Sequence, residues 1–353
     1  MAKISTIGVL TSGGDAPGMN AAIRAVTRAA IYNGWKVKGI YRGWEGLINN
    51  EIKDFTSESV SGTINRGGTI LRTARSKDFM NEEGRARAYE NIKAHGIDAL
   101  IVIGGNGSLA GAQVIASEYD IPCVGLPGTI DNDLYGTDTT IGYDTALNTI
   151  MECVDKIRDT ANSHNRIFFV EVMGRDAGWI ALNAAVAGGA EVCLLPEFPY
   201  DIEIVKEKLE SRFVHDRGFA VVVISEGAKP KDGQQVFEVS KEVGYENVKL
   251  GGIGQKFIEQ MKAAGFKHDM RETTLGHLQR GGVPIAYDRV LASQFGVKAF
   301  EMVLNQEYGN MVAYRHPNII SVPLKDAVAK MNLVTKDHDL VRTAMGLGIS
   351  LGI

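Results

Sequence analysis

The chain has 353 residues, of which 44% are hydrophobic and 23% charged, and its formal net charge at pH 7 is −4. This composition is typical of a globular chain long enough for two domains, or for two lobes that share one core. A nucleic-acid-binding protein should be basic, so the charge argues against that class while allowing a local basic pocket for a small anion. Apolar runs stay short of the ~18 residues of a membrane span, and the first residues lack the apolar core of a secretory signal. We therefore expect a cytoplasmic protein with neither a nucleic acid nor a membrane as partner.

Three cysteines, Cys123, Cys153 and Cys193, lie far apart in apolar surroundings. Their spacing matches no metal-binding pattern. Free cysteine behaves as a small hydrophobic residue, so the sequence predicts three buried, reduced thiols.

Short apolar runs alternate with amphipathic segments along the chain. Nearly continuous apolar runs are typical of strands that are buried on both faces of a parallel sheet. Alternation of such strands with helices predicts a doubly wound α/β fold with parallel-rich sheets. In chain order we expect a strand at 7–10, a helix at 19–34, strands at 99–103 and 121–126, a helix at 144–161, and strands at 166–172 and 219–224.

The turns that follow the predicted strands are rich in glycine, hydroxyl and charged residues. Ligands collect at the carboxyl ends of the strands in such sheets. One glycine-rich turn is common for geometric reasons alone, but five in one chain indicate a ligand site. The five are TSGGDAPG (11–18), GGNGS (104–108), PGTIDND (127–133), MGRDAG (173–178) and SEGAKP (225–230).

Two of these turns have the character of anion-binding cradles. In both 11–18 and 104–108, glycines let the backbone approach a phosphate, and free N–H groups at the start of the next helix attract it. Neither turn has the Walker pattern or the GxGxxG pattern. Arg75 could add a cation for negative charge that develops during a reaction, or it could simply be a surface arginine.

Carboxylates and arginines provide the remaining chemistry. Asp131 and Asp133 are two residues apart, so an extended turn places both on one side, where one can act as a general base and the other as a charge partner. Aspartates in turns also commonly cap backbone groups, and a lone histidine such as His277 is often structural. Arginine forks match phosphate geometry. Together these residues indicate phosphoryl transfer between a nucleotide and a phosphorylated metabolite.

Over about residues 4 to 300, the sequence resembles the 6-phosphofructokinase family. The motifs that carry the resemblance occur in the family's order: TSGGDAPGMNAAIRAV, INRGGT, GLPGTIDND, VEVMGR, AGGAE and LGHLQRGG. The resemblance implies two α/β lobes with the active site in the cleft between them, and a homotetramer with allosteric control. It implies a glycolytic reaction with Mg²⁺, in which ATP phosphorylates the 1-hydroxyl of fructose 6-phosphate to give fructose 1,6-bisphosphate.

The resemblance also divides the chain between the lobes. Residues 1–142 with about 275–318 would form the nucleotide-binding lobe. Residues 143–274 with about 319–353 would form the sugar-phosphate-binding lobe.

The family's motif positions imply a role for individual residues. Asp131 would be the general base, Thr129 would contact the transferred phosphoryl group, and Arg175 and Arg75 would steady the developing charge. Nucleotide contacts would come from Gly13, Arg75, Ser76, Gly105, Asn106, Gly107 and Ser108, with Trp44 near the adenine. Substrate contacts would come from Thr129, Ile130, Asp131, Asp133, Arg166, Met173, Gly174, Arg175, Glu226, Arg271, His277 and Arg280, of which Arg166 and Arg271 would belong to a neighbouring subunit. Effector contacts would come from Arg24, Arg28, Arg158, Glu191, His215 and Arg217.

Two glycines bear on the phosphoryl donor. Family members that use pyrophosphate tend to have an aspartate where this chain has Gly107 and a lysine where it has Gly128. Both glycines therefore resemble the ATP-using type, because a carboxylate at Gly107 would crowd and repel an α-phosphate.

The sequence departs from the family pattern in four places. Asn106 replaces an aspartate that helps to hold Mg²⁺; its amide oxygen could still bind a metal-bound water, or the change could mark a catalytically poor regulatory homologue. The span 227–270 is longer than in short bacterial members, and similar lengths in pyrophosphate-dependent relatives keep that donor open. The tail after about residue 320 is also longer, and Ser57 replaces an effector-site arginine.

Overall fold

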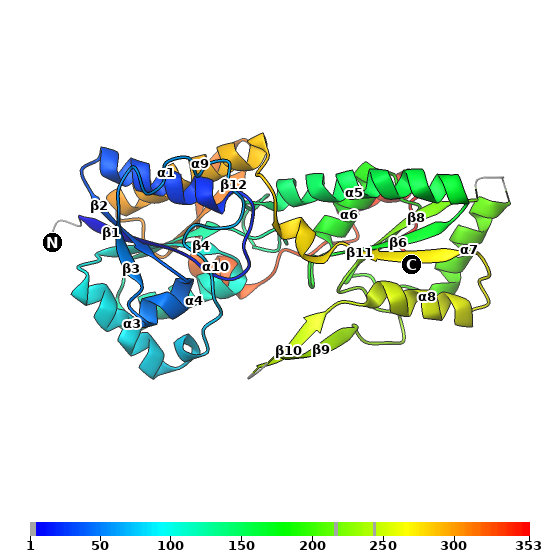
Figure 1. Ribbon diagram of the computed structural model, residues 1–353, viewed down its shortest axis with the longest axis horizontal. Helices are drawn as coiled ribbons and strands as arrows, with labels where there is room; N and C mark the ends of the chain where they lie inside the picture. Colours follow the sequence, from blue (N-terminus) through cyan, green and yellow to red (C-terminus); the bar gives the residue numbers. More distant parts are fainter. Residues whose placement is uncertain (1–4, 215–217, 243–244) are drawn as a thin grey trace. The chain divides into compact units, whose positions relative to one another are not determined.

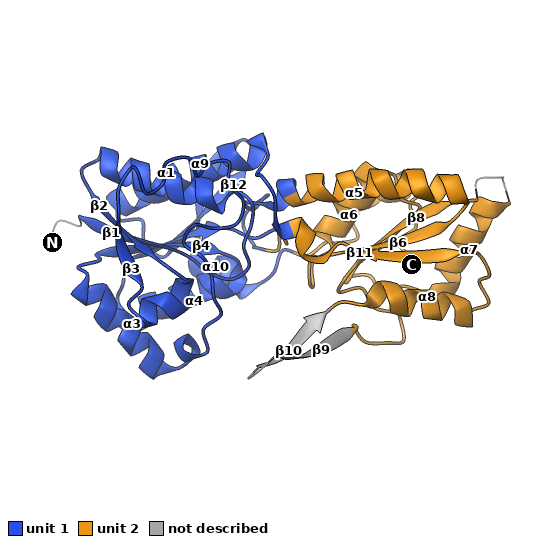
Figure 2. Cartoon of the chain, viewed as in Figure 1, with its two compact units in different colours: residues 1–130, 134–145, 280–332 blue, residues 131–133, 146–279, 333–353 orange. Residues whose placement is uncertain are grey.

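We describe a computed structural model of the chain, which covers residues 5–214, 218–242 and 245–353, with side chains described outside 237–250. The chain divides into two compact units (Figure 2). Unit 1 comprises residues 1–130, 134–145 and 280–332, and unit 2 comprises residues 131–133, 146–279 and 333–353. No helix in the described part is long and apolar enough to cross a membrane.

Unit 1 is built on a seven-stranded sheet in the order β13-β12-β5-β4-β1-β2-β3 (Figure 1). The pairs β12–β5, β5–β4, β4–β1 and β1–β2 are parallel, and only the outer pairs β12–β13 and β2–β3 are antiparallel. The strands are β1 (Thr6–Thr11), β2 (Lys36–Ile40), β3 (Ile52–Phe55), β4 (Ala99–Gly104), β5 (Cys123–Pro127), β12 (Asn310–Arg315) and β13 (Asn318–Pro323).

Helices cover both faces of this sheet. Helices α1 and α9 pack together on one face, and α3, α4 and α10 lie on the other (Figure 1). Every residue of β1, β4 and β5 is buried, as their apolar sequences predict for strands with helices on both sides. The helices are α1 (Met19–Tyr32), α2 (Gly43–Ile48), η1 (Asp78–Met80), α3 (Glu82–Ala94), α4 (Asn106–Tyr119), α9 (Ala286–Leu304) and α10 (Leu324–Ala329).

Unit 2 is built on a four-stranded, fully parallel sheet in the order β11-β6-β8-β7. Strands β9 and β10 form a separate antiparallel pair within the long span after Glu226. The strands are β6 (Ile167–Val172), β7 (Val192–Leu194), β8 (Ala220–Ser225), β9 (Phe237–Glu242), β10 (Tyr245–Leu250) and β11 (Met270–Thr274). The helices are α5 (Tyr143–His164), α6 (Trp179–Gly188), α7 (Ile202–Phe213), α8 (Ile253–Ala263), η2 (Gly276–Arg280) and α11 (Asp339–Gly346).

The five strands and two helices expected from the sequence are confirmed, with ends shifted by a few residues. The observed division differs from the expected one at residues 131–133 and 275–279, which lie in unit 2, at residues 143–145, which lie in unit 1, and at residues 319–332. Strand β13 pairs with β12 and α10 packs on α4, so this segment belongs to unit 1 and the chain enters unit 2 only at Leu333. Cys123 and Cys193 are buried free thiols as predicted, whereas Cys153 is only partly buried because it lies on the amphipathic helix α5.

Candidate active site

Three glycine-rich turns of unit 1 lie together at the carboxyl edge of its sheet. The amide of Ser12 donates to the carbonyl of Ile103 (3.0 Å), and the amide of Gly128 donates to the carbonyl of Gly104 (3.0 Å). These bonds continue the β1–β4 and β4–β5 pairings beyond the strands and hold the turns side by side. The structure therefore brings Gly13, the 104–108 turn and Thr129 to one edge, as the strand order predicts.

The turn 104–108 leads directly into α4, which begins at Asn106 with Gly105 as its N-cap. A Cβ on Gly104 would lie 2.6 Å from the carbonyl oxygen of Ser12, so only glycine fits there. Nothing lies within 4 Å of the position of a Cβ on Gly107. The N-terminus of this 14-residue helix therefore opens next to free space at Gly107, an arrangement that favours an anion.

Gly13 and Arg280 complete the described part of this edge. Gly13 has a φ of +83°, and its Cβ would lie 3.1 Å from Oγ of the buried Ser108. Arg280 is partly buried, its guanidinium lies against Gly14, and its Nη1 donates to the carbonyl of Asp15 (3.3 Å). The backbone of the turn after β1 is therefore in contact with a guanidinium group.

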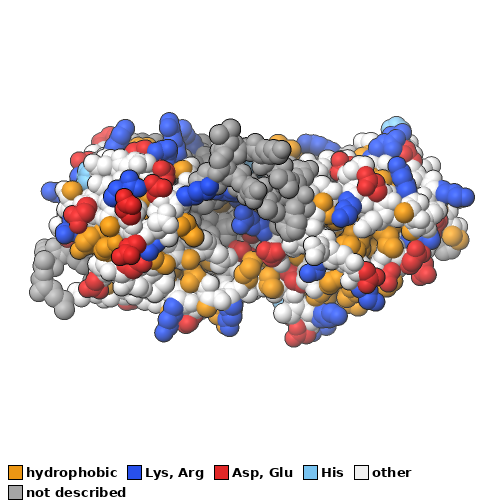
Figure 3. Space-filling model, turned by 90° about the horizontal axis from the view of Figure 1, so that it is seen from below, with side chains coloured by type: hydrophobic (Ala, Val, Ile, Leu, Met, Phe, Trp, Pro, Cys, Tyr) orange, Lys and Arg blue, Asp and Glu red, His pale blue; other side chains and the backbone are white. Residues whose placement is uncertain are grey.

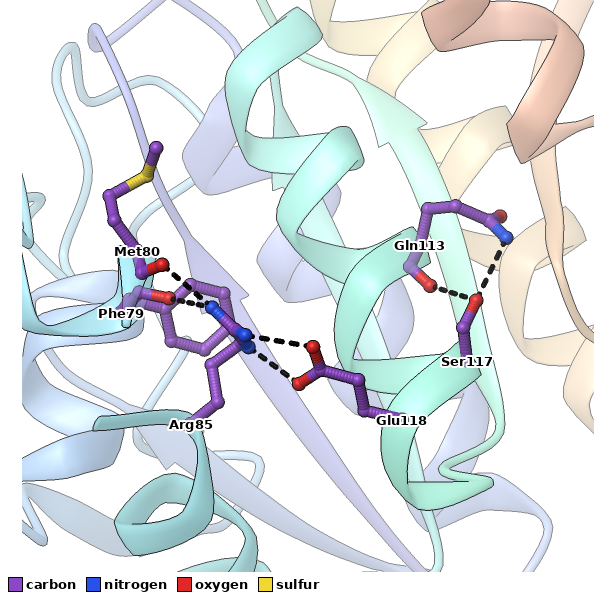
Figure 4. Close-up of polar contacts among 6 residues, drawn as sticks. All are labelled: Phe79, Met80, Arg85, Gln113, Ser117 and Glu118. Atoms are coloured by element: carbon purple, nitrogen blue, oxygen red, sulfur yellow. Dashed lines mark hydrogen bonds and ion pairs between the residues drawn. The ribbon is translucent and has the colours of Figure 1, made fainter. Parts of the chain in front are cut away.

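The segment with Arg75 and Ser76 is anchored to α4 through η1. The amide of Phe79 donates to Oγ of Ser76 (3.2 Å). Nη1 of Arg85 donates to the carbonyls of Phe79 and Met80. The same guanidinium forms a bidentate ion pair with Glu118 of α4, with Nε 2.5 Å from Oε2 and Nη2 2.8 Å from Oε1 (Figure 4). Arg75 itself is exposed. Through η1 and Arg85, the helix that begins at Asn106 thus also holds the chain directly after Arg75 and Ser76.

Trp44, which the family resemblance implies near the adenine, packs against η1 and α4. Its ring is 5% exposed and stacks on Phe79 with centroids 4.3 Å apart. A Cβ on Gly111 of α4 would lie 2.8 Å from its Nε1. Trp44 therefore packs among α2, η1 and α4, and its place near the adenine stays a prediction.

The turn after β5 carries the paired aspartates. Asp131 and Asp133 are each 6% exposed, and Ile130 is fully buried. Thr129 is buried as well, and its carbonyl accepts a hydrogen bond from Oγ1 of Thr140 (2.5 Å). Burying two carboxylates this deeply costs free energy unless hydrogen bonds or charged partners offset the lost hydration, so such a pair in a turn indicates a functional site.

In unit 2, the loop after β6 is held by side chains from distant segments. The amide of Met173 donates to Oε1 of Gln279 (3.1 Å), and the amide of Arg175 donates to Oε1 of Glu226 (3.1 Å). Gly174 and Arg175 have φ values of +131° and +53°, and the second value is uncommon for a residue with a side chain. The side chain of Arg175 is exposed. The loop therefore presents a guanidinium from a backbone that its neighbours hold in an uncommon conformation.

Glu226 has an unusual protonation equilibrium. The pKa of its carboxyl is raised to about 7, chiefly by burial; the amide of Arg175 lowers this pKa, and the charges of Asp131 and Glu171 raise it. A carboxyl with such a pKa exchanges its proton near neutral pH, which is typical of functional sites.

Arg166 and Arg271 share one carboxylate in unit 2. Nε of Arg166 lies 2.7 Å from Oδ2 of Asp269, and Arg271 pairs with the other oxygen of the same group. Strands β6 and β11 are neighbours, which brings the two arginines together although they are distant in the sequence. Asp269, which directly precedes β11, was not among the predicted site residues.

His277 and Gln279 lie in η2, the short helix that follows β11. His277 is exposed, whereas Gln279 is fully buried and bonds Met173 as described above. Of the LGHLQRGG motif, only His277 and Arg280 were predicted as site residues; Gln279 was not. The glutamine stands between His277 and Arg280, and that position was the available signal.

Two of the expected effector residues line a cavity of about 460 Å³ in unit 2. Arg158 donates to the carbonyls of Gly188 and Gly189 (2.6 and 2.5 Å). Glu191 is 9% exposed, pairs with Arg212 (3.0 Å) and accepts from the amide of Val221. The cavity is lined by Arg158, Asn162, Asn165, Glu191, Arg212, Gly218 and Phe219, of which Arg212 and the two asparagines were not expected from the sequence.

The other expected effector residues lie elsewhere or outside the described part. Arg24 and Arg28 are on α1 of unit 1, where Arg24 is partly buried and Arg28 exposed. Ser57 lines a separate cavity of about 390 Å³ in unit 1. His215 and Arg217 lie outside the described residues.

Among the described side chains, no group of three or more His, Cys, Asp or Glu residues is placed to hold a metal ion. On the face drawn in Figure 3, acidic and basic side chains are interspersed over the described surface of each unit.

Comparison with known proteins places this geometry in a family. A family model described as Phosphofructokinase matches residues 6–303. An ATP-dependent 6-phosphofructokinase 2 of Bacteroides thetaiotaomicron is 52% identical over 337 residues, which cover 96% of this chain and 97% of the relative. The chain is also similar to the solved structure of Pichia pastoris phosphofructokinase in the T-state, with a TM-score of 0.82 and 37% identity over 93% of this chain and 36% of that chain. It is similar as well to a pyrophosphate-dependent phosphofructokinase structure from Marinobacter aquaeolei, with a TM-score of 0.80 and 25% identity over 98% of this chain and 88% of that chain.

Proposed function

This chain belongs to the phosphofructokinase family, and from that premise we propose that it is an ATP-dependent 6-phosphofructokinase. It transfers the γ-phosphoryl group of ATP to the 1-hydroxyl of fructose 6-phosphate and yields fructose 1,6-bisphosphate and ADP, a reaction of glycolysis in the cytoplasm. The name of the Bacteroides relative supports ATP as the donor. The single structural observation that supports it best is the open space at Gly107, beside the N-terminus of α4.

Both glycines that bear on the donor have surroundings that suit ATP. An aspartate at Gly107 would project a negative charge into the space where we place the α-phosphate. At Gly128 a Cβ would lie 3.0 Å from Ile103 and 3.1 Å from Met19, so a lysine would need both neighbours to shift. The Marinobacter structure has the same fold, and therefore the fold alone does not select the donor.

In the proposed mechanism, Asp131 accepts the proton of the sugar 1-hydroxyl as its oxygen attacks the γ-phosphorus. The bond from that phosphorus to the bridging oxygen breaks, and ADP leaves. Thr129 contacts the transferred group, while Ile130 and Asp133 shape the sugar side. Catalysis of this kind depends mainly on positioning and on neutralising charge.

Arg175 and Arg75 would stabilise the charge on the transferred phosphoryl group. The uncommon backbone of Arg175, held through Glu226 and the Gln279–Met173 bond, supports a fixed direction for its guanidinium. The same family positions suggest which residues contact each substrate. Nucleotide contacts come from Gly13, Arg75, Ser76, Gly105, Asn106, Gly107 and Ser108, and sugar-phosphate contacts from Arg166, Met173, Gly174, Arg175, Glu226, Arg271, His277 and Arg280.

The residues around Asn106 fit a Mg²⁺ ion that arrives with the nucleotide. Mg²⁺ usually keeps several waters and binds through phosphates and one or two protein oxygens, so it needs no protein cage, and the described residues contain none. When bound, Mg²⁺ neutralises phosphate charge. We propose that the amide oxygen of Asn106 contributes through one of the metal-bound waters.

We further propose that the chain works as a homotetramer, in which Arg166 and Arg271 serve the sugar-phosphate site of a neighbouring subunit. Their shared pairing with Asp269 supports this role, because it holds the two guanidinium groups together. The cavity that Arg158 and Glu191 line suits an anionic effector, with Arg24, Arg28, His215 and Arg217 as further candidates.

Replacement of the proposed base tests this function. The change Asp131→Asn keeps the side chain's size but removes its basicity, so kcat should fall by about 10²- to 10⁴-fold while fructose 6-phosphate still binds. Steady-state turnover and calorimetric titration of the sugar phosphate measure the two effects. Asp201→Asn is the matched control, because the side chain of Asp201 caps α7 by accepting from the amide of Glu203 (3.0 Å). An Asp131→Asn variant with unchanged kcat would rule out the assigned role.

A further inference from the structure

Asp288 is a buried carboxylate with no role in the proposed reaction. It lies in the first turn of α9 and is fully buried. Its Oδ1 accepts from the amide of Gly142 (2.8 Å), and its Oδ2 accepts from the amide (2.7 Å) and hydroxyl (2.5 Å) of Thr145. Oγ1 of Thr145 in turn accepts from the amide of Ile285 (3.1 Å). Because an unsatisfied buried carboxylate would be costly, these donors fix the segment around Gly142 against α9.

The segment next to Gly142 holds the turn that carries the proposed base. The amide of Ile141 donates to the carbonyl of Pro127 (2.9 Å), and Ile141 pairs with Gly128 as a parallel bridge. Oγ1 of Thr140, itself fully buried, donates to the carbonyl of Thr129 (2.5 Å). The chain reaches Asp131 two residues later, so these bonds set the direction in which it leaves Thr129.

Asp288 and its partners also pack against the turn after β1. Gly142 has a φ of +97°, and its Cβ would lie 2.7 Å from the Cβ of Ala16. Gly18 has a φ of +112°, and its Cβ would lie 2.8 Å from Cγ2 of Ile141 and 3.5 Å from the Cβ of Asp288. The anion-binding turn and the base-carrying turn are thus supported by the same few residues.

We propose that Asp288 is a positioning residue for the reaction, which acts through residues 140–142 to fix the backbone from Pro127 to Thr129 and thereby the place of Asp131. This inference rests on the proposed function, because it takes Asp131 as the general base. The alternative is that Asp288 merely caps α5 through Thr145. A simple cap would explain the bonds to Thr145 and leave the bond between Thr140 and Thr129 without consequence for catalysis.

The test uses the full chain with Thr140→Val, Thr140→Ser and Asp288→Asn. Thr140→Val removes the hydroxyl that holds Thr129, and Thr140→Ser keeps it. We expect kcat to fall about 10- to 100-fold in Thr140→Val and in Asp288→Asn, with KM for both substrates within about 3-fold of the parent, because a misplaced base affects the transition state more than binding. Thr140→Ser should restore kcat to within about 3-fold of the parent.

Thr27→Val is the matched control. Thr27 is fully buried like Thr140, but its hydroxyl makes no hydrogen bond among the described residues. Its loss should therefore leave kcat unchanged. Parent kcat in Thr140→Val, or equal loss in Thr140→Val and Thr140→Ser, would overturn the proposal. Parent kcat in a folded Asp288→Asn would overturn it as well. If Asp288→Asn fails to fold, the two Thr140 variants still test the bond through which Asp288 is proposed to act.

Hydrogen exchange separates this proposal from the proposed function. Amides of residues 128–133 should exchange faster in Thr140→Val and in Asp288→Asn than in the parent and in Thr27→Val, whichever substrates the chain uses. A parent chain that turns over neither donor would contradict the proposed function. Unchanged exchange in the two variants would contradict the positioning proposal.

Discussion

The two units present charge-binding groups in different ways. The edge of unit 1 relies on backbone: glycines at 13, 104, 105 and 107 and the N-terminus of α4 form most of it. The edge of unit 2 relies on side chains from distant segments that hold a loop: Glu226 accepts from the amide of Arg175, and Gln279 accepts from the amide of Met173. A backbone cradle tolerates no added atoms at its tightest points, whereas a side-chain site depends on the charge state of its partners. Substitutions at the first edge should therefore act through steric conflict or charge repulsion, whereas those at the second should change how stability depends on pH.

Among substitutions that compare the two edges, a charge placed in the open part of the backbone cradle should reduce activity most. Gly107→Asp puts a carboxylate into space that is free of protein atoms, where it would repel a nucleotide phosphate. We expect kcat/KM for ATP to fall about 100-fold, or about 2.7 kcal/mol, with the thermal midpoint nearly unchanged. Gly107→Ala is the control, since it adds volume without charge. If Gly107→Asp kept full ATP activity, the nucleotide could not lie at this turn.

Closer to the sheet, the same cradle should fail by steric conflict. Gly104→Ala places a Cβ 2.6 Å from the carbonyl oxygen of Ser12, which is backbone and cannot move aside easily. We expect a loss of about 1–3 kcal/mol in the free energy of unfolding, measured by urea denaturation. Gly107→Ala again serves as comparison and should change stability by less than about 1 kcal/mol. Equal stability of the two variants would show that the contact at Gly104 is not tight.

The side-chain edge should instead respond to pH. The pKa of Glu226, about 7, lies above its ordinary value of 4.5, so its contribution to stability is complete below about pH 4.5 and is lost as pH rises through 7. Glu226→Gln cannot ionise, and its amide oxygen can still accept from Arg175. At pH 8 we expect the free energy of unfolding of Glu226→Gln to exceed that of the parent by about 1–2 kcal/mol. The difference is limited because Glu226 is only partly buried and solvent screens its charge.

The same pair of proteins should have similar stability at pH 4.5, which makes the low-pH measurement an internal control. KM for fructose 6-phosphate should rise in the variant, because Glu226 is proposed to bind the sugar. A stability difference independent of pH would show that Glu226 does not titrate near 7.

The smallest effect concerns the anchor of the Arg75 segment. Glu118→Gln removes one charge from the pair with Arg85, which is only partly exposed to solvent, at 13% and 35% for the Arg85 and Glu118 side chains. We expect a loss of about 0.5–1 kcal/mol in stability and a rise of about 2- to 5-fold in KM for ATP. Asp54→Asn, which breaks the Lys38–Asp54 pair on β2 and β3, is a comparable change away from this segment and should leave KM unchanged.

What could be predicted from the sequence follows the same division. Turns of the backbone edge could be located because glycines and strand order are local patterns, and the five predicted strands occur in the structure. Partners such as Gln279, Asp269 and Arg212 could not, because β11 reaches β6 and α7 reaches Glu191 only through the fold. The packing of Trp44 shows a related limit, because only the fold brings its ring onto Phe79 and α4.

The division between the units shows the same limit. An edge hairpin such as β12–β13 has no signal in the chain that tells which sheet it will extend, and so residues 319–332 were assigned to the wrong lobe. Likewise, the bonds from Asp288 to Gly142 and Thr145 join segments more than 140 residues apart.

ATP as the donor can be tested by giving the purified, unaltered chain fructose 6-phosphate and Mg²⁺ with either ATP or pyrophosphate, and measuring the fructose 1,6-bisphosphate formed. The open space at Gly107 and the confined Gly128 predict turnover with ATP and negligible turnover with pyrophosphate. Turnover with pyrophosphate alone would contradict the donor assignment. Turnover with neither would contradict the proposed activity and point to Asn106, where Asn106→Asp would be the next variant to assay.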